Sequence, residues 1–324
     1  MRCPMTRVTA LSLSLTSLAI WVGACYTSPS APTLGADSLT ATIPVSGGTY
    51  GIAVAGNGTV YATLAGGSSL VRITLSTSSV ARTFPVGLFP TGVAFAPSGA
   101  TAYVTNQGSQ SLGVVDVATD SQVATIHVNG DPFVTLPSPD GARVIVAAND
   151  DSIFVIDPAA RTVKSSLYVG LAPNGLAFNA AGTRLYVSNF LGGTVAEVDP
   201  AVPAVLRTFT TGGAPQGLAL SGNGTELYVA NENGWLDVFD VAAGARLDSV
   251  PLAGRAFGLA RSPDDAVLYV GLYSTGQVAV INRATRRIIK TLLVNGDPRR
   301  IAFTADSRHA VIANAAGWVD VVTR

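Results

Sequence analysis

The chain has 324 residues, in which 20 basic residues balance 20 acidic ones. This balance argues against general nucleic-acid binding, because proteins of that class neutralise phosphates with an excess of lysine and arginine. Hydrophobic residues make up 48% of the chain and charged residues only 12%, and with 34 glycines this composition favours a tightly packed β protein.

The first residues have the pattern of an export signal. Arg2 and Arg7 precede the apolar stretch Val8–Ala24, which predicts a signal peptide over residues 1–24. A transmembrane helix is the less favoured alternative, because serines interrupt a short apolar run. Val22–Cys25 (VGAC) resembles the bacterial lipobox. The resemblance implies that Cys25 is lipidated and becomes the mature N-terminus; ordinary signal-peptidase cleavage is the alternative.

Residues 25–38 follow the signal and are predicted to be a tether, because they are polar and contain Pro29 and Pro32. We expect an exported protein that is lipid-anchored to the bacterial cell envelope through Cys25, either at the outer membrane and periplasm or at the cell surface. Cys3 lies in the signal peptide, so Cys25 would be the only cysteine of the mature chain and no internal disulfide is expected.

Residues 171–213 read as four short strands separated by turn residues. The predicted strands are Gly175–Phe178, Arg184–Asn189, Thr194–Asp199 and Val205–Thr211. No run in this unit has helical period or length. A single sheet of this kind cannot bury both faces, so it must stack on neighbours.

Related units recur along the chain at steps of 41 or 42 residues. The position of Gly175 is matched, in chain order, by Gly51, Gly92, Val134, Gly217, Gly258 and Arg300. Four strands in each of seven such units predict a seven-bladed β-propeller with four-stranded antiparallel blades.

The seventh unit stops after its third strand, at Arg324. Leu39–Gly47 matches the fourth-strand pattern of other units, such as Val80–Gly87. This early segment is therefore expected to provide the outer strand of the last blade and to close the ring, which leaves no unpaired inner edge. The propeller is predicted to span residues 39–324.

Several units carry a short motif on the second strand. Tyr103–Asn106 reads YVTN, and Tyr186–Asn189 and Tyr228–Asn231 read YVSN and YVAN. The chain resembles the YVTN-repeat, or YncE-like, propellers of bacterial envelopes and archaeal surface layers. This resemblance covers residues 39–324 and implies a propeller fold and an envelope location. Blades three, six and seven depart from the motif, at Ile145, Gly271 and Val311.

The loops that enter each blade and those that join its second and third strands meet at one mouth of a propeller channel, where ligands usually bind. The candidate ligand-binding residues in these loops are Asp131, Asn189, Asn231, Arg255, Asp297, Arg299, Arg300 and Asn314. The three arginines belong to adjacent blades and are suited to an anion. The alternatives are arginines that are solvated or paired with Asp297, and asparagines that cap turns.

No catalytic residue, metal site or cofactor is predicted. Asp116, Asp157, Asp199 and Asp240 occupy one repeat position that also accepts Asn282, which indicates a turn-forming role. Asp150 and Asp151 are too few for a calcium site. His127 and His309 fall in different blades and away from the mouth, so a transition-metal site or a histidine-based triad is poorly supported.

These observations favour a non-enzymatic envelope lipoprotein whose propeller presents a binding or scaffolding face to an envelope protein or a small anionic ligand. Resemblance to seven-bladed lactonases gives the alternative of a hydrolase acting at the mouth. That alternative requires Asp131, Asp297, Arg255, Arg299 and Arg300 to converge within hydrogen-bond distance. A weaker alternative is single-stranded nucleic-acid binding, described for a relative of the YVTN-repeat family.

Overall fold

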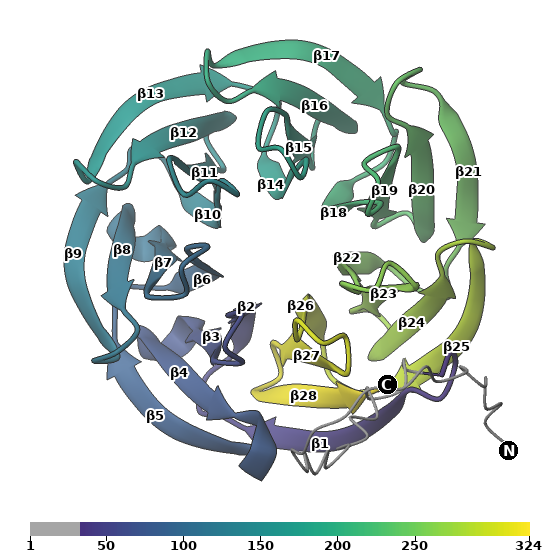
Figure 1. The fold of residues 1–324 in the computed structure, drawn as a ribbon, viewed down its shortest axis with the longest axis horizontal. Coiled ribbons are helices and arrows are strands. Elements are labelled where there is room, and N and C mark those ends of the chain that lie inside the picture. Colours follow the sequence, from purple (N-terminus) through teal and green to yellow (C-terminus); the bar gives the residue numbers. More distant parts are fainter. Residues whose placement is uncertain (1–32) are drawn as a thin grey trace, which may run out of the picture. The chain divides into compact units, whose positions relative to one another are not determined.

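The computed structural model describes residues 33–324. The predicted signal peptide over residues 1–24, the lipidation site at Cys25 and the first part of the tether lie outside the described residues. Seven four-stranded antiparallel sheets form the blades of a ring (Figure 1). The predicted all-β fold, a seven-bladed propeller, is confirmed.

Each blade runs outwards from an inner strand beside the channel. The inner strands of blades one to seven are β2 (Thr49–Val54), β6 (Pro90–Phe95), β10 (Pro132–Pro137), β14 (Pro173–Phe178), β18 (Pro215–Leu220), β22 (Ala256–Arg261) and β26 (Pro298–Phe303). The second strands are β3 (Val60–Leu64), β7 (Thr101–Asn106), β11 (Val144–Ala148), β15 (Leu185–Asn189), β19 (Glu226–Asn231), β23 (Val267–Leu272) and β27 (His309–Asn314). The third strands are β4 (Ser69–Thr74), β8 (Ser111–Asp116), β12 (Ser152–Asp157), β16 (Thr194–Asp199), β20 (Trp235–Asp240), β24 (Gln277–Asn282) and β28 (Trp318–Thr323). The outer strands are β5 (Ser79–Pro85), β9 (Ser121–His127), β13 (Thr162–Tyr168), β17 (Ala204–Thr210), β21 (Arg246–Pro251), β25 (Arg287–Leu293) and, for blade seven, β1 (Ser38–Pro44).

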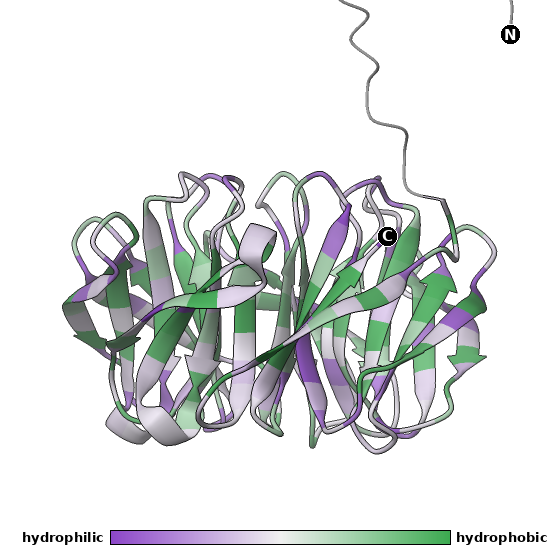
Figure 2. Ribbon diagram, turned by 90° about the horizontal axis from the view of Figure 1, so that it is seen from below, coloured by the Kyte–Doolittle hydropathy of each residue, from purple (hydrophilic) through white to green (hydrophobic). Residues whose placement is uncertain are grey.

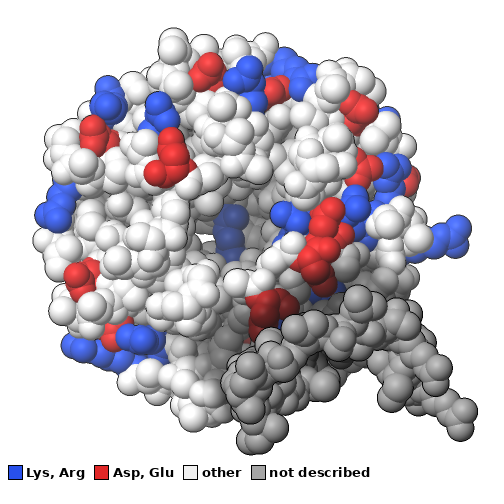
Figure 3. Space-filling model, in the orientation of Figure 1, with Lys and Arg blue, Asp and Glu red and all other residues white. Residues whose placement is uncertain are grey.

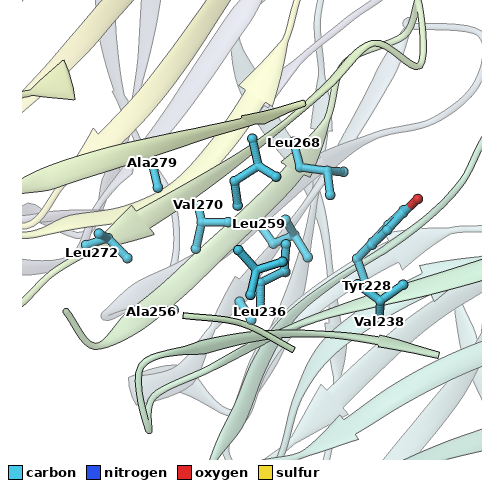
Figure 4. Packing of buried hydrophobic residues seen from close by; sticks show 12 residues of the cluster. Tyr228, Leu236, Val238, Ala256, Leu259, Leu268, Val270, Leu272 and Ala279 are labelled. Atoms are coloured by element: carbon cyan, nitrogen blue, oxygen red, sulfur yellow. The ribbon is translucent and has the colours of Figure 1, made fainter. Parts of the chain in front are cut away.

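The core lies between blades, because each middle strand is covered on both sides by its neighbours. Every residue of β3 is buried, whereas the outer strand β5 is exposed except at Phe84. Figure 2 shows the hydrophobic residues running along the strands between the two faces that carry the loops. The cluster between blades five and six illustrates the packing (Figure 4); it includes Tyr228, Leu236, Leu259, Leu268 and Val270. Burial on this scale is the dominant favourable term in folding.

The repeated glycine marks a bulge where each inner strand meets the next blade. In β14 the register shifts between Pro173 and Gly175. A Cβ on Gly175 would lie 2.2 Å from the Gln216 carbonyl oxygen of blade five, so no larger residue fits. Ser188 Oγ accepts a hydrogen bond from Gly175 N at 2.7 Å and donates one to Gln216 O at 2.6 Å. The third residue of the YVTN-like motif thus joins neighbouring blades.

The ring is closed by the N-terminal strand, as predicted. β1 pairs antiparallel with β28 from Ser38 opposite Thr323 to Pro44 opposite Trp318. Beyond the strand, Asp37 is buried, accepts a hydrogen bond from the Tyr269 hydroxyl of blade six, and lies 3.5 Å from Arg324 Nε. Both ends of the described chain are therefore fixed to the ring.

Helical structure in residues 33–324 is limited to single 3₁₀ turns, η1 (Ala65–Gly67), η2 (Leu75–Thr77) and η3 (Gln107–Ser109). Across this same stretch we find no helix with the length and apolar character needed to cross a membrane.

Candidate functional site

The channel is lined by all seven inner strands, which enclose a cavity of about 340 Å³. At its mouth, each inner strand begins with a bulge, and the residue before the repeated glycine position is of six different types in the seven blades. In blade order these residues are Tyr50, Thr91, Phe133, Asn174, Gln216, Phe257 and Arg299. We call this set the collar. The fold repeats the position, whereas its side chains place aromatic and polar residues in turn around the mouth.

Arg300 stands where most blades have glycine, and its side chain crosses the channel. Its Nη2 donates to the carbonyl oxygen of Asn174 at 3.0 Å and to Asn174 Oδ1 at 3.1 Å. Asn174 belongs to β14, on the opposite side of the ring from β26 (Figure 1). The guanidinium carbon lies 5.8 Å from the centre of the Phe133 ring and 5.5 Å from that of Phe257. Figure 3 shows a basic side chain inside the channel, where Arg300 is a lining residue.

The charge of Arg300 is poorly compensated. Among residues 33–324, the ion pairs within 4.0 Å do not include Arg300. Arg300 is partly exposed in the channel, and desolvation by the surrounding protein, with a further contribution from Arg299, lowers the pKa of Arg300 to about 10. The group stays charged at neutral pH, so a cation without a carboxylate partner stands in the channel.

Arg299 lies in an aromatic box at the mouth. Its guanidinium carbon is 4.8 Å from the ring centres of Phe257 and Tyr273 and 5.4 Å from that of Tyr50. Nη2 pairs with Asp297 Oδ2 at 2.7 Å. Arg299 Nε and Asp297 Oδ1 are buried without a hydrogen-bond partner among the described residues. This ion pair therefore keeps one unused donor and one unused acceptor.

Glu232 organises the remaining side of the mouth. It is 8% exposed and accepts hydrogen bonds from Tyr273 Oη at 2.8 Å and from Gln216 Nε2 at 2.6 Å. Arg255 also pairs with its carboxylate. Burial and the bond to Glu232 raise the pKa of Tyr273 to about 12, so this hydroxyl remains a donor. Gln216 Oε1 is a further buried acceptor without a partner in the part of the chain described.

The predicted acid–arginine residues do not form one cluster. Asp297 pairs with Arg299, whereas Arg255 pairs with Glu232 and Arg300 reaches Asn174. Asp131, in the loop that enters blade three, is exposed. Within residues 33–324 it makes no ion pair with these arginines, so the arrangement that a lactonase-like site requires is not assembled from this set.

The predicted asparagines bond to backbone. The Nδ2 atoms of Asn189, Asn231 and Asn314 donate to the carbonyl oxygens of Val169, Gly212 and Asn295, at 2.8, 2.8 and 2.9 Å. Each acceptor lies in the loop that enters the same blade. These contacts support the interpretation in which asparagine holds loop geometry. Asn189 Oδ1 alone among the three amides is buried without a partner in the described chain.

Sequence reasoning missed Asn174, Gln216 and Phe257 as mouth residues; it placed Glu232 in a mouth loop but did not choose it as a ligand-binding candidate. A signal was available, because the collar position varies strongly while the position after it is mostly glycine. Residues 33–324 contain no group of three His, Cys, Asp or Glu side chains placed to hold a metal ion. The mouth is instead a site for polar and charged contacts.

No protein-family model matches the chain, and no curated protein matches it. Among solved structures, the chain is similar to a chain of the Kuenenia stuttgartiensis hydrazine synthase, with a TM-score of 0.80 and 21% identity over 86% of this chain and 96% of that chain. At this identity the likeness concerns the fold alone. The comparison supports what the strands show: this chain is a seven-bladed β-propeller.

Proposed function

We propose that this protein is an exported, lipid-anchored binding protein of the bacterial envelope, related to the YVTN-repeat propellers, whose channel mouth binds a small anionic ligand. Export is supported by the signal-like residues 1–24 and the lipobox-like Cys25. The relation to the YVTN-repeat propellers is supported by the motif of Tyr103–Asn106. The observation that carries the binding role is Arg300, a charged group in the channel without a carboxylate partner among the described residues.

A carboxylate or phosphate would improve the contacts of this group. A neutral amide partner, Asn174, does not compensate the cost of desolvating a cation. An anionic ligand would form charge-assisted, two-pronged bonds with the guanidinium, and these are about twice as strong as neutral hydrogen bonds. Phe133 and Phe257, which lie beside the guanidinium, supply apolar walls. Deeper in the channel, Arg300 and the later residues of the inner strands line the cavity of about 340 Å³, a volume in the range of small-molecule sites.

The direction of the tether fits this role. β1 pairs at Pro44 with Trp318, which follows a loop on the mouth face, and at Ser38 with Thr323 near the opposite face. A tether that enters at Ser38 therefore enters on the face away from the mouth.

Calorimetric titration of the purified protein with acetate, succinate, citrate and phosphate tests the binding site. We expect at least one anion to bind, and Arg300→Gln to weaken it about ten- to hundredfold, because a hydrogen bond to a charged group contributes about 1.5–3 kcal/mol. Arg287→Gln, on the exposed outer strand of blade six, is the matched control and should bind like the unmodified protein. Absence of binding, or equal binding by Arg300→Gln, would refute the anion site.

Fractionation of cells tests the anchor separately. Cys25→Ser should move the protein from the membrane fraction to the supernatant, because the thiol that carries the lipid is lost. Cys3→Ser removes the other cysteine of the chain and should leave the protein in the membrane fraction. Membrane retention of the Cys25→Ser variant would show that the anchor lies elsewhere.

A further inference from the structure

A seven-residue pattern occurs in two blades and has two different outcomes. Blade five carries Asn231–Asp237 (NENGWLD) and blade seven carries Asn314–Asp320 (NAAGWVD). In both, the asparagine Nδ2 donates to Oδ2 of the aspartate, at 3.3 Å in blade five and 3.2 Å in blade seven. The two segments therefore share one hydrogen-bonded frame, and the tryptophan between its ends can be compared directly.

In blade seven the indole closes over the aspartate. Trp318 Nε1 donates to Asp320 Oδ2 at 2.9 Å. In blade five, Trp235 is 42% exposed, and its Nε1 makes no hydrogen bond within the described residues. A pocket of about 360 Å³ opens beside it instead, lined by blade five and by the loop that enters this blade. Of the two blades with this motif, blade five has an accessible tryptophan face beside a polar pocket, whereas in blade seven the indole is bonded to the aspartate.

The pocket contains a carboxylate and a guanidinium side by side. Asp237 is 2% exposed and accepts a hydrogen bond from Ser249 Oγ at 2.6 Å. Arg246 Nη1 lies 3.6 Å from Asp237 Oδ1, and its Nη2 donates to the Thr211 carbonyl oxygen at 2.5 Å. Because the two charges offset each other, the pocket suits a neutral ligand that both donates and accepts hydrogen bonds.

Glycine backbone forms the wall facing the indole. Gly212 and Gly213 both have positive φ, 65° and 58°, a conformation that favours glycine. A Cβ on Gly213 would lie 2.3 Å from Asn233 Nδ2, which also lines the pocket. The space is therefore kept open by residues without side chains, and an amide group stands at its edge.

We propose that this pocket binds a pyranose sugar. One face of the ring would stack on Trp235, and vicinal hydroxyls would donate to Asp237 and accept from Arg246 and Asn233. A flat indole beside a few placed polar groups is the usual composition of a small-ligand site, and the volume lies in the range of such sites. The inference does not depend on the anion site, since no residue of this pocket contacts Arg299 or Arg300.

Tryptophan fluorescence can be assigned to this pocket, because Trp235 and Trp318 are the two tryptophans of the described residues. Emission is compared between Trp318→Phe and the double variant that also carries Trp235→Phe. The difference isolates Trp235 and cancels Trp21. The probes are methyl glucopyranosides and N-acetylglucosamine, with glycerol as a polyol without a ring and adenosine as a planar ligand. We expect a saturable change with a pyranoside and none with glycerol.

Asp237→Asn should weaken that binding about tenfold, because it removes the charge of the hydroxyl acceptor while preserving size. Asp320→Asn, at the equivalent position of blade seven, should bind the sugar as the unmodified protein does. Circular dichroism melts show that each variant is folded, and calorimetry gives a binding readout independent of fluorescence. A response to adenosine alone, no response to any pyranoside, or equal weakening by both substitutions would overturn the proposal.

Discussion

Blades five and seven share the seven-residue motif between their second and third strands. They differ in which part of the chain provides the outer strand. In blade five, β21 follows β20 along the chain, whereas in blade seven β1 arrives from the other end. Ser249 faces Asp237, and Thr42 takes the equivalent place opposite Asp320. Two positions further along the ladder, blade five has Arg246 opposite Phe239, where blade seven has Leu39 opposite Val322. One outer-strand residue therefore changes the charge beside an otherwise common frame.

The consequence is electrostatic. Asp237 has a guanidinium next to it, whereas Asp320 is fully buried with neutral donors only: Thr42 Oγ1 at 2.8 Å, Asn314 Nδ2 and Trp318 Nε1. Burial raises the pKa of Asp320 from 3.8 to about 6 even though these bonds lower it. The Trp318 indole donates to the Asp320 carboxylate, which has no cationic partner among the described residues. Asp237 has Arg246 beside it, and Trp235 remains exposed. The outer strand is thus one cause of the difference; within the motif, the pocket residue Asn233 is replaced by Ala316 in blade seven.

Deleting residues 33–44 tests the borrowed strand and should have the largest effect. The deletion exposes β28 as an edge, removes Ile43 from the core and leaves the buried Arg324 without Asp37. Loss of a buried isoleucine alone costs about 2–5 kcal/mol and the whole β1 ladder is lost with it, so we expect cooperative thermal unfolding to be lost or shifted far down, although Arg324 keeps its 3.2 Å pair with Asp264. A synthetic peptide of residues 33–44 added in trans should restore part of the stability by strand addition. An unchanged melt would contradict the closure.

The sequence repeat explains why the propeller ring could be predicted. It does not specify which side chains meet at the channel mouth, so the candidate site was predicted only in part. Gly175 and Ser188 act between adjacent units in the chain, and the 41- or 42-residue spacing carries that information. The bond from Arg300 to Asn174 joins blades on opposite sides of the channel, and no local pattern specifies which residues meet there. The pairing of Arg299 with Asp297 was foreseen as an alternative, because the two are two residues apart.

The different fates of Trp235 and Trp318 could not be read from their common motif. They depend in part on Arg246, which is close in sequence to Asp237 in blade five, and on Leu39, which is 281 residues before Asp320 in blade seven (320 − 39). Arg246 and Leu39 come into register with the motif only after the sheet forms. Physical contact across the outer ladder therefore contributes to the difference between the two sites.

Exchanging each aspartate for asparagine should change stability in opposite directions. In Asp320→Asn, the amide oxygen can accept from Asn314 and Trp318 while the amide nitrogen donates to Thr42 Oγ1, so the frame is retained without a buried charge. The rise of about two pKa units corresponds to about 3 kcal/mol, and we expect a gain of about 1–3 kcal/mol at pH 7. Asp237→Asn removes the partner of a partly exposed arginine and should cost about 1 kcal/mol or less.

The pH dependence of the free energy of unfolding tests the role of the Asp320 charge. Because the pKa of Asp320 is raised on folding, the folded state binds its proton more tightly, and the stabilisation present below about pH 4 is lost as the pH rises to about 6. Urea melts of the unmodified protein should therefore lose a contribution over this window that Asp320→Asn lacks. Leu39→Arg places in blade seven the arginine that blade five has at the equivalent position, Arg246. It should reduce this pH-dependent loss of stability, because the new guanidinium can pair with the Asp320 carboxylate. If Asp320→Asn still loses stability between about pH 4 and pH 6, another group causes the loss. The charge of Asp320 would then not explain the difference between the blades.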